Sequence, residues 1–222
     1  MRRIALLLIA LTLPASAQWV DLLTPNLAGW EILGDGVWRM RSDGVLTAHR
    51  LPDLKKLSLA TTKIDQEAFH GWESMQSWLY TKKEYDEFDL SLEYWVRSPG
   101  NSGISIRDQT QAAAALTQPP DFSRTPSKVG YEIQINSEWP DPHPSGSIYG
   151  LADAPEGVHR VGEWNHMLIS SRGDSIEVRL NGLLVAEHPG DPKRPKRGPI
   201  GLQLHDQFSF VMFRSIRVRE VE

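Results

Sequence analysis

Short segments of alternating apolar and polar residues run through most of the chain, and turns rich in Gly, Pro, Asn and Asp separate them. A period of two is typical of strands that bury one face, and helical patterns are scarce. Asn181-Gly182 is the strongest hairpin signal. The expected strands are 36–40, 45–49, 58–61, 86–96, 103–107, 130–136, 147–151, 165–172, 175–180, 183–188, 200–205 and 211–220.

About eleven or twelve such strands predict an all-β fold, a two-sheet jelly-roll sandwich of the concanavalin A type. Two long segments, 108–129 and 137–146, interrupt the alternation, and both contain several prolines. Loops of that length in a compact sandwich are either disordered or functional. The run Pro140-Asp141-Pro142-His143-Pro144 indicates a stiff loop.

Four segments combine an apolar face with a face of hydrogen-bonding side chains, because residues i and i+2 of a strand share a face. A sheet that is wet on one side would explain the alternation alone. Amide, guanidinium, imidazole and phenol groups, however, make directional hydrogen bonds that suit sugar hydroxyls. The polar sets are Glu132, Gln134 and Asn136; Gln203 and His205; Asn101, Gly103, Ser105 and Arg107; and Ser147 and Tyr149.

The N-terminus predicts export. Arginines at 2–3, an apolar run at 4–13 and the small residues Ala15-Ser16-Ala17 form the pattern of a signal peptide. The run is too short to span a bilayer, so we expect no membrane span, cleavage after Ala17 and a periplasmic or secreted protein. Removing 17 of the 222 residues leaves 205, which suits one domain over 18–222.

Composition limits the partners and cofactors. The net charge of −4 argues against nucleic-acid binding. The absence of cysteine excludes disulfides and thiolate metal sites. No ligand spacing predicts a metal or other cofactor, although Glu132, His205 and Asp206 could contact a divalent ion that polarises a carbonyl. Among the eight tryptophans, Trp139 is the candidate sugar platform, because it follows the Glu132 strand in the proline-rich loop.

Short motifs also occur in a characteristic order over nearly all of 18–222. They are Trp19–Leu23 with Leu27–Trp30, Val37-Trp38, Asp43–Leu46, Tyr85–Leu90, Gly100–Ile104 with Arg107, Gly130–Ile135, Gly146–Leu151, Gly162–Asn165, Leu180–Gly182, Gly198–Gln203 and Phe213–Val218. No single motif is specific, but the ordered set resembles the 3-keto-disaccharide hydrolase family, long known as a domain of unknown function. Family members often have Asp before the late His and Gly after it, whereas Leu204 and Asp206 flank His205 here.

The resemblance implies a concanavalin A-like fold and a carbohydrate substrate. It implies an enzyme that hydrolyses glycosides, such as disaccharides, whose sugar has been oxidised to a ketone at C3. A sugar 3-oxidoreductase acting upstream would then be a pathway partner.

The strand around Glu132 lacks the second carboxylate of an ordinary glycosidase. Such enzymes need two carboxyl groups roughly 5–10 Å apart. The alternate position on this strand is Gln134, although Asp206 or Glu138 could supply a second acid. A C3 ketone offers another route, in which a base removes the C2 proton, the glycosidic oxygen leaves C1, and water adds to the enone.

This route needs a base, donors for the enolate oxygen and a proton source. Glu132 or His205 suits the base, and Tyr149 or Glu132 could protonate the leaving group. Arg107, with Asn101 or Gln203, suits the enolate oxygen. The candidate catalytic residues are therefore Glu132, His205 and Arg107, and the candidate substrate-binding residues are Asn101, Gln134, Tyr149, Gln203 and Trp139.

Each assignment has an alternative. Glu132 could simply pair with Arg107 across the sheet face, and His205 could have a structural role. The main alternative function is a non-catalytic, lectin-like carbohydrate-binding module of the cell envelope, because the same fold and polar face serve both functions. A structural or protein-interaction domain is a third interpretation. Convergence of Glu132, Arg107, His205 and Tyr149 in one cavity would favour catalysis.

Overall fold

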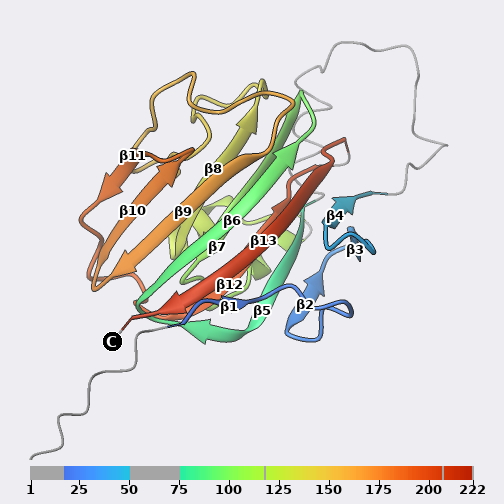
Figure 1. The fold of residues 1–222 in the computed structure, drawn as a ribbon. Coiled ribbons are helices and arrows are strands. Elements are labelled where there is room, and N and C mark those ends of the chain that lie inside the picture. Colours follow the sequence, from blue (N-terminus) through green and yellow to red (C-terminus); the bar gives the residue numbers. More distant parts are fainter. Residues whose placement is uncertain (1–17, 51–75, 118, 207, 222) are drawn as a thin grey trace, which may run out of the picture.

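The computed structural model describes residues 18–50, 76–117, 119–206 and 208–221. Two antiparallel β-sheets pack face to face, with the larger sheet in front in Figure 1. The larger sheet has the order β11 (Leu183–His188), β10 (Ser175–Leu180), β9 (Asn165–Arg172), β6 (Phe88–Val96), β13 (Val211–Glu220), β4 (Leu46–His49) and β3 (Val37–Met40), and β1 (Val20–Asp21) pairs with β13.

The smaller sheet has five strands and carries the polar residues of interest. Its order is β2 (Trp30–Leu33), β5 (Ser77–Tyr85), β12 (Gly198–Leu204), β7 (Gly100–Ile106) and β8 (Tyr131–Ser137). The segment between β7 and β8 contains three short helical turns, which are η1 (Ala113–Leu116), η2 (Phe122–Arg124) and α2 (Pro126–Val129). None of the described helices is long and apolar enough to cross a membrane.

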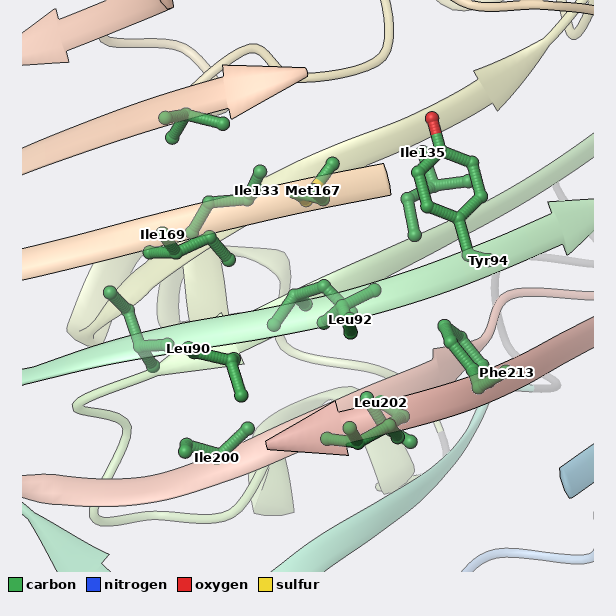
Figure 2. Packing of buried hydrophobic residues seen from close by; sticks show 14 of the residues in the cluster. Leu90, Leu92, Tyr94, Ile133, Ile135, Met167, Ile169, Ile200, Leu202 and Phe213 are labelled. Carbon is green, nitrogen blue, oxygen red and sulfur yellow. The ribbon is translucent and has the colours of Figure 1, made fainter. Parts of the chain in front are cut away.

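The core lies between the two sheets. The apolar side chains at every second position of β6, from Phe88 to Val96, are at most 1% exposed. They pack in one cluster with the isoleucines of β8 and with Ile200 and Leu202 of β12 (Figure 2). Burying each such side chain contributes about 1.5–3 kcal/mol. The prediction of an all-β, concanavalin A-like jelly-roll sandwich is confirmed.

Most strands lie where the alternation predicts them, and 165–172, 175–180, 183–188 and 211–220 match at both ends. The expected strand 147–151 is wrong, because Ile148 forms only isolated bridges and Gly146 and Gly150 turn the chain at positive φ. The alternation did not predict β1, β2 or β5. The expected strand 58–61 and the expected signal peptide lie outside the described residues.

The long segment 108–129 covers part of the smaller sheet's outer face. Trp78 and Tyr80 of β5 stack with their ring centroids 5.6 Å apart, and they form a second apolar cluster with Ala112 and Ala115. This cluster anchors the segment on the sheet. The neighbouring part of the same face, over β12, β7 and β8, is left open to a cavity.

Candidate active site

A cavity of about 280 Å³ opens on the outer face of the five-stranded sheet. Strands β7, β8 and β12 supply its floor, and the segments 122–128 and 141–149 supply its walls. Six of the eight candidate residues line it, namely Asn101, Glu132, Gln134, Tyr149, Gln203 and His205.

Strand register brings the floor residues together. Ser105 lies opposite Glu132 and Gly103 opposite Gln134, so the carboxyl and amide side chains project beside β7. A Cβ atom at Gly103 would lie 2.9 Å from Glu132 Oε1 and 3.3 Å from Gln203 Oε1. The missing side chain at Gly103 therefore makes the room that these two head groups occupy.

Glu132 is the buried ionisable group of this floor, with only 8% of the residue exposed. Burial raises its pKa from 4.5 to about 7, and the charges of Asp141 and Asp108 act in the same direction. The charge of His205 and a hydrogen bond from Gln203 oppose the rise in pKa. Glu132 therefore changes protonation near neutral pH, where it can donate or accept a proton.

Three buried amides surround this carboxyl, each at most 2% exposed. Asn101 Oδ1, Gln134 Nε2 and Gln203 Oε1 have no hydrogen-bond partner among the described residues. Leaving a buried polar atom unpaired costs about 1–3 kcal/mol. All three residues line the cavity, and amide groups hydrogen-bond to hydroxyls, so the cavity fits a sugar better than an apolar molecule.

His205 lies just beyond the end of β12, at the edge of the cavity. Its Nδ1 is 3.3 Å from Asp206 Oδ2, and the edge of its ring meets Trp139 with 5.8 Å between centroids. The expectation that Trp139 offers an open sugar platform is wrong, since the residue is only 4% exposed. Glu138 turns the chain at a φ of 54°, and Trp139 N donates to Asn136 Oδ1, so the indole folds inward.

The expectation that Arg107 shares the polar face is also wrong. Arg107 follows the last residue of β7 with a φ of 61°, and this left-handed conformation ends the alternation of side chains. Its Nη2 donates to Ser171 Oγ at 2.6 Å and to the Gly173 carbonyl at 2.7 Å. The guanidinium therefore joins β7 to the β9–β10 hairpin instead of pairing with Glu132.

The structure also brings in residues that the alternation did not predict. Phe122, Lys128 and Asp141 line the cavity from loops or short helical turns, where no period of two exists. Asp141 accepts hydrogen bonds from the Tyr149 hydroxyl at 3.0 Å and from His143 N at 2.8 Å. Its position in the stiff proline-rich run was the one available signal.

The second carboxyl group of the cavity is therefore Asp141, and neither of the two expected candidates lines the cavity. Glu138 is exposed and accepts a hydrogen bond from Ser98, while Asp206 is fully buried beside His205. Within the described ranges, no group of three or more His, Asp or Glu side chains is placed to hold a metal ion.

Comparison with known proteins adds a family and several related folds. A family model described as a 3-keto-alpha-glucoside-1,2-lyase-like domain matches residues 18–219. The crystal structure of a putative glycosyl hydrolase from Parabacteroides distasonis ATCC 8503 is 26% identical, with a TM-score of 0.65, and the match covers 92% of this chain and 100% of that one.

Two further crystal structures support the fold. A second putative glycosyl hydrolase from the same organism is 18% identical over 92% of this chain and 94% of that one, with a TM-score of 0.63. A galectin-like protein of unknown function from Bacillus subtilis is 12% identical over 93% and 96% of the two chains, with a TM-score of 0.62. No curated protein matches the chain.

Proposed function

The chain belongs to the family of 3-keto-alpha-glucoside-1,2-lyase-like domains, and from this premise we propose that it cleaves the glycosidic bond of 3-keto-glycosides such as 3-keto-disaccharides. The observation that carries the proposal is Glu132, a buried carboxyl with a pKa of about 7 on the floor of a cavity lined by unpaired amides. A face that only binds sugar has no need of a buried group that titrates near neutral pH.

In the proposed reaction, His205 removes the proton from C2, which the neighbouring ketone acidifies. The electrons of the C2–H bond form an enolate and then expel the glycosidic oxygen from C1. The protonated form of Glu132 gives its proton to that oxygen. Water then adds across the C1=C2 bond: its hydroxyl goes to C1, its proton returns to Glu132, and His205 gives its proton to C2.

The enolate oxygen needs a donor, and the contacts of Arg107 take it out of this role. Lys128 and Gln134 both line the cavity, and we assign their side-chain N–H groups this role instead. The Tyr149 hydroxyl already donates to Asp141, which favours Glu132 over Tyr149 as the acid for the leaving group. Asn101 and Gln203 are left to bind sugar hydroxyls.

Two other functions remain to be separated from this one by experiment. Asp141 and Glu132 line one cavity, which favours two-carboxylate hydrolysis of an ordinary glycoside as the second candidate. The unpaired amides would equally suit a lectin-like module without turnover. Product release from a 3-keto-disaccharide would support the proposed function. Release from the same disaccharide unoxidised would support two-carboxylate hydrolysis, and release from neither would support a lectin-like module.

Reaction in D₂O separates the mechanisms further. Elimination followed by hydration places solvent deuterium on C2 of the released 3-keto sugar, whereas direct displacement at C1 leaves the original hydrogen there. We expect deuterium at C2 above the level of an enzyme-free control, and loss of turnover in E132Q and H205A. Wild-type turnover in both variants would contradict the roles of these two residues.

We also propose that another enzyme acts before this one and that this protein lies outside the cytoplasm. A ketone at C3 has to be made by an oxidoreductase that removes hydride from that carbon, so such an enzyme would act before this one. Export to the periplasm or beyond would follow cleavage after Ala17. The mass of the mature chain would then correspond to an N-terminus at Gln18.

A further inference from the structure

We propose that Asp206 is a positioning residue that fixes the tautomer of His205, so that Nε2 carries the lone pair that accepts the substrate proton. The role of His205 as the base rests on the proposed function. The tautomer itself is a property of the free protein and can be measured without any substrate.

Asp206 is a fully buried carboxylate whose two oxygens are both engaged. Oδ1 accepts hydrogen bonds from the backbone N–H groups of Phe208 at 2.7 Å and Ser209 at 2.8 Å. Oδ2 accepts a hydrogen bond from Ser209 Oγ at 2.6 Å and faces His205 Nδ1. Burial by itself would raise the pKa of Asp206, but the hydrogen bonds from His205 and Ser209 outweigh it and hold the pKa below 3.8.

An ionised carboxylate can only accept hydrogen bonds, so the His205 nitrogen that faces Asp206 has to carry a proton. A neutral imidazole has a single N–H group, and Nε2 is then the nitrogen with the lone pair. The Trp139 ring packs against the imidazole, with 5.8 Å between the ring centroids. The same logic applies to the Asp that orients His in serine protease triads.

Ser209 also joins Asp206 to the cavity floor. Ser209 Oγ accepts a hydrogen bond from Asn101 N at 3.0 Å, and the Asn101 side chain lines the cavity. Ser209 thus connects the Asp206 carboxylate to the first residues of β7. The arrangement holds the proposed base and one sugar-binding amide in a fixed relation.

Asp206→Asn is a sharp test, because the surrounding donors determine how the new amide lies. Two backbone N–H groups point at the Oδ1 position, so the amide oxygen has to stay there. The NH₂ group then takes the Oδ2 position and donates to His205 Nδ1. The lone pair moves to Nδ1 and the proton to Nε2, which disables the base.

We expect D206N to lower kcat by about 100-fold or more, because a comparable Asp-to-Asn change in a triad costs still more. KM should change by less than about threefold, since Asp206 does not line the cavity. The matched control is Ser209→Ala, which keeps the carboxylate and its backbone donors. It should lose less than about tenfold in kcat.

Nitrogen-15 NMR of the imidazole provides the readout that a structural role would not move. The wild-type protein should show the Nδ1–H tautomer of neutral His205, and D206N the Nε2–H tautomer. An Nε2–H tautomer in the wild type, or a D206N that keeps the wild-type tautomer and kcat, would overturn the proposal. Where D206N does not fold, the wild-type tautomer decides.

Failure of the proposed function is a separate result. A wild-type protein that cleaves no 3-keto-glycoside yet shows the Nδ1–H tautomer would refute the activity and keep the positioning role of Asp206.

Discussion

Glu132 lowers the stability of the fold when its carboxyl is ionised, whereas the proposed acid role uses the protonated form. Its pKa rises from 4.5 to about 7 on folding, chiefly because burial disfavours the charged form. Below pH 4.5 the carboxyl is protonated in both the folded and the unfolded chain, so folding carries no penalty. As the pH rises from 4.5 through 7 the unfolded chain ionises before the folded one, so the free energy of unfolding falls, by about 3 kcal/mol once both states are ionised.

Glu132→Gln should therefore stabilise the protein at alkaline pH. The amide has nearly the same shape and no charge, so we expect its free energy of unfolding at about pH 8 to exceed that of the wild type by up to ~3 kcal/mol. The difference should shrink towards zero as the pH falls to 4.5. Urea denaturation across this pH range measures it, and Glu156→Gln is the exposed control. If the free energy of unfolding depended on pH in the same way in E132Q and in the wild type, a raised pKa of Glu132 would be contradicted.

The pH dependence of turnover distinguishes the two roles open to the same residue. A general acid has to be protonated in the free enzyme, so kcat/KM should fall about tenfold per pH unit above a pKa of about 7. A general base would instead make kcat/KM rise to a plateau through the same pH range. A kcat/KM that does not fall above a pKa of about 7 would contradict the acid role of Glu132.

At the scale of elements, strands were predictable wherever one face carries apolar and the other polar side chains, even where both faces are buried, as in β7 and β12. Strand β5 does not alternate near its start, because Leu79 packs in the core while Trp78 and Tyr80 on the other face pack against the 108–129 segment. Without a polar face there is no alternation to detect. Strand β6 keeps its strict period of apolar residues and was found.

The same limit explains which site residues could be predicted. Glu132, Gln134 and Gln203 follow from alternation on their strands, whereas the position of Arg107 depends on a single left-handed φ that alternation cannot show. Asp141 comes from a loop, where only the folded chain determines its neighbours.

Gly103 tests how the three floor strands share space. Gly103→Ala places a Cβ 2.9 Å from Glu132 Oε1, the end of a side chain that can move aside. We expect the free energy of unfolding to change by less than about 1 kcal/mol, while kcat falls by about tenfold or more as the carboxyl is displaced. Gly29→Ala, with open space around its Cβ, is the matched control. Unchanged kcat in G103A would show that the carboxyl position is not critical.

At the scale of the whole molecule, the outer faces of the two sheets differ in how their polar side chains are paired. The outer side of the larger sheet holds ion pairs such as Arg172 and Arg219 with Asp89. The outer side of the smaller sheet holds unpaired amides and the raised carboxyl of Glu132. The unpaired amides of the cavity therefore lie on one side of the sandwich. Two loops that are far apart in the sequence form the walls of the cavity.

Those walls suggest which part of the substrate each region contacts. In the proposed reaction the amide floor would bind the hydroxyls of the oxidised sugar, and we expect the leaving group to face the rim of the cavity. Phe122 lies on the wall and is 48% exposed, unlike the buried Trp139. The Asp121 side chain caps its short helical turn by accepting a hydrogen bond from Ser123 N at 3.0 Å. We therefore expect Phe122 to offer an exposed aromatic surface to the leaving sugar.

Phe122→Ala should weaken binding of a disaccharide and spare a substrate that lacks the second ring. Losing one aromatic contact with a pyranose face, worth about 1 kcal/mol, should raise KM for a 3-keto-disaccharide about fivefold. KM for a methyl 3-keto-glucoside should stay unchanged, and so should kcat for both substrates, because the expected contact is to the leaving sugar and not to the groups that transfer protons. Phe122→Tyr keeps the ring and should behave like wild type. Equal increases in KM for the two substrates would place the contact at the oxidised sugar instead.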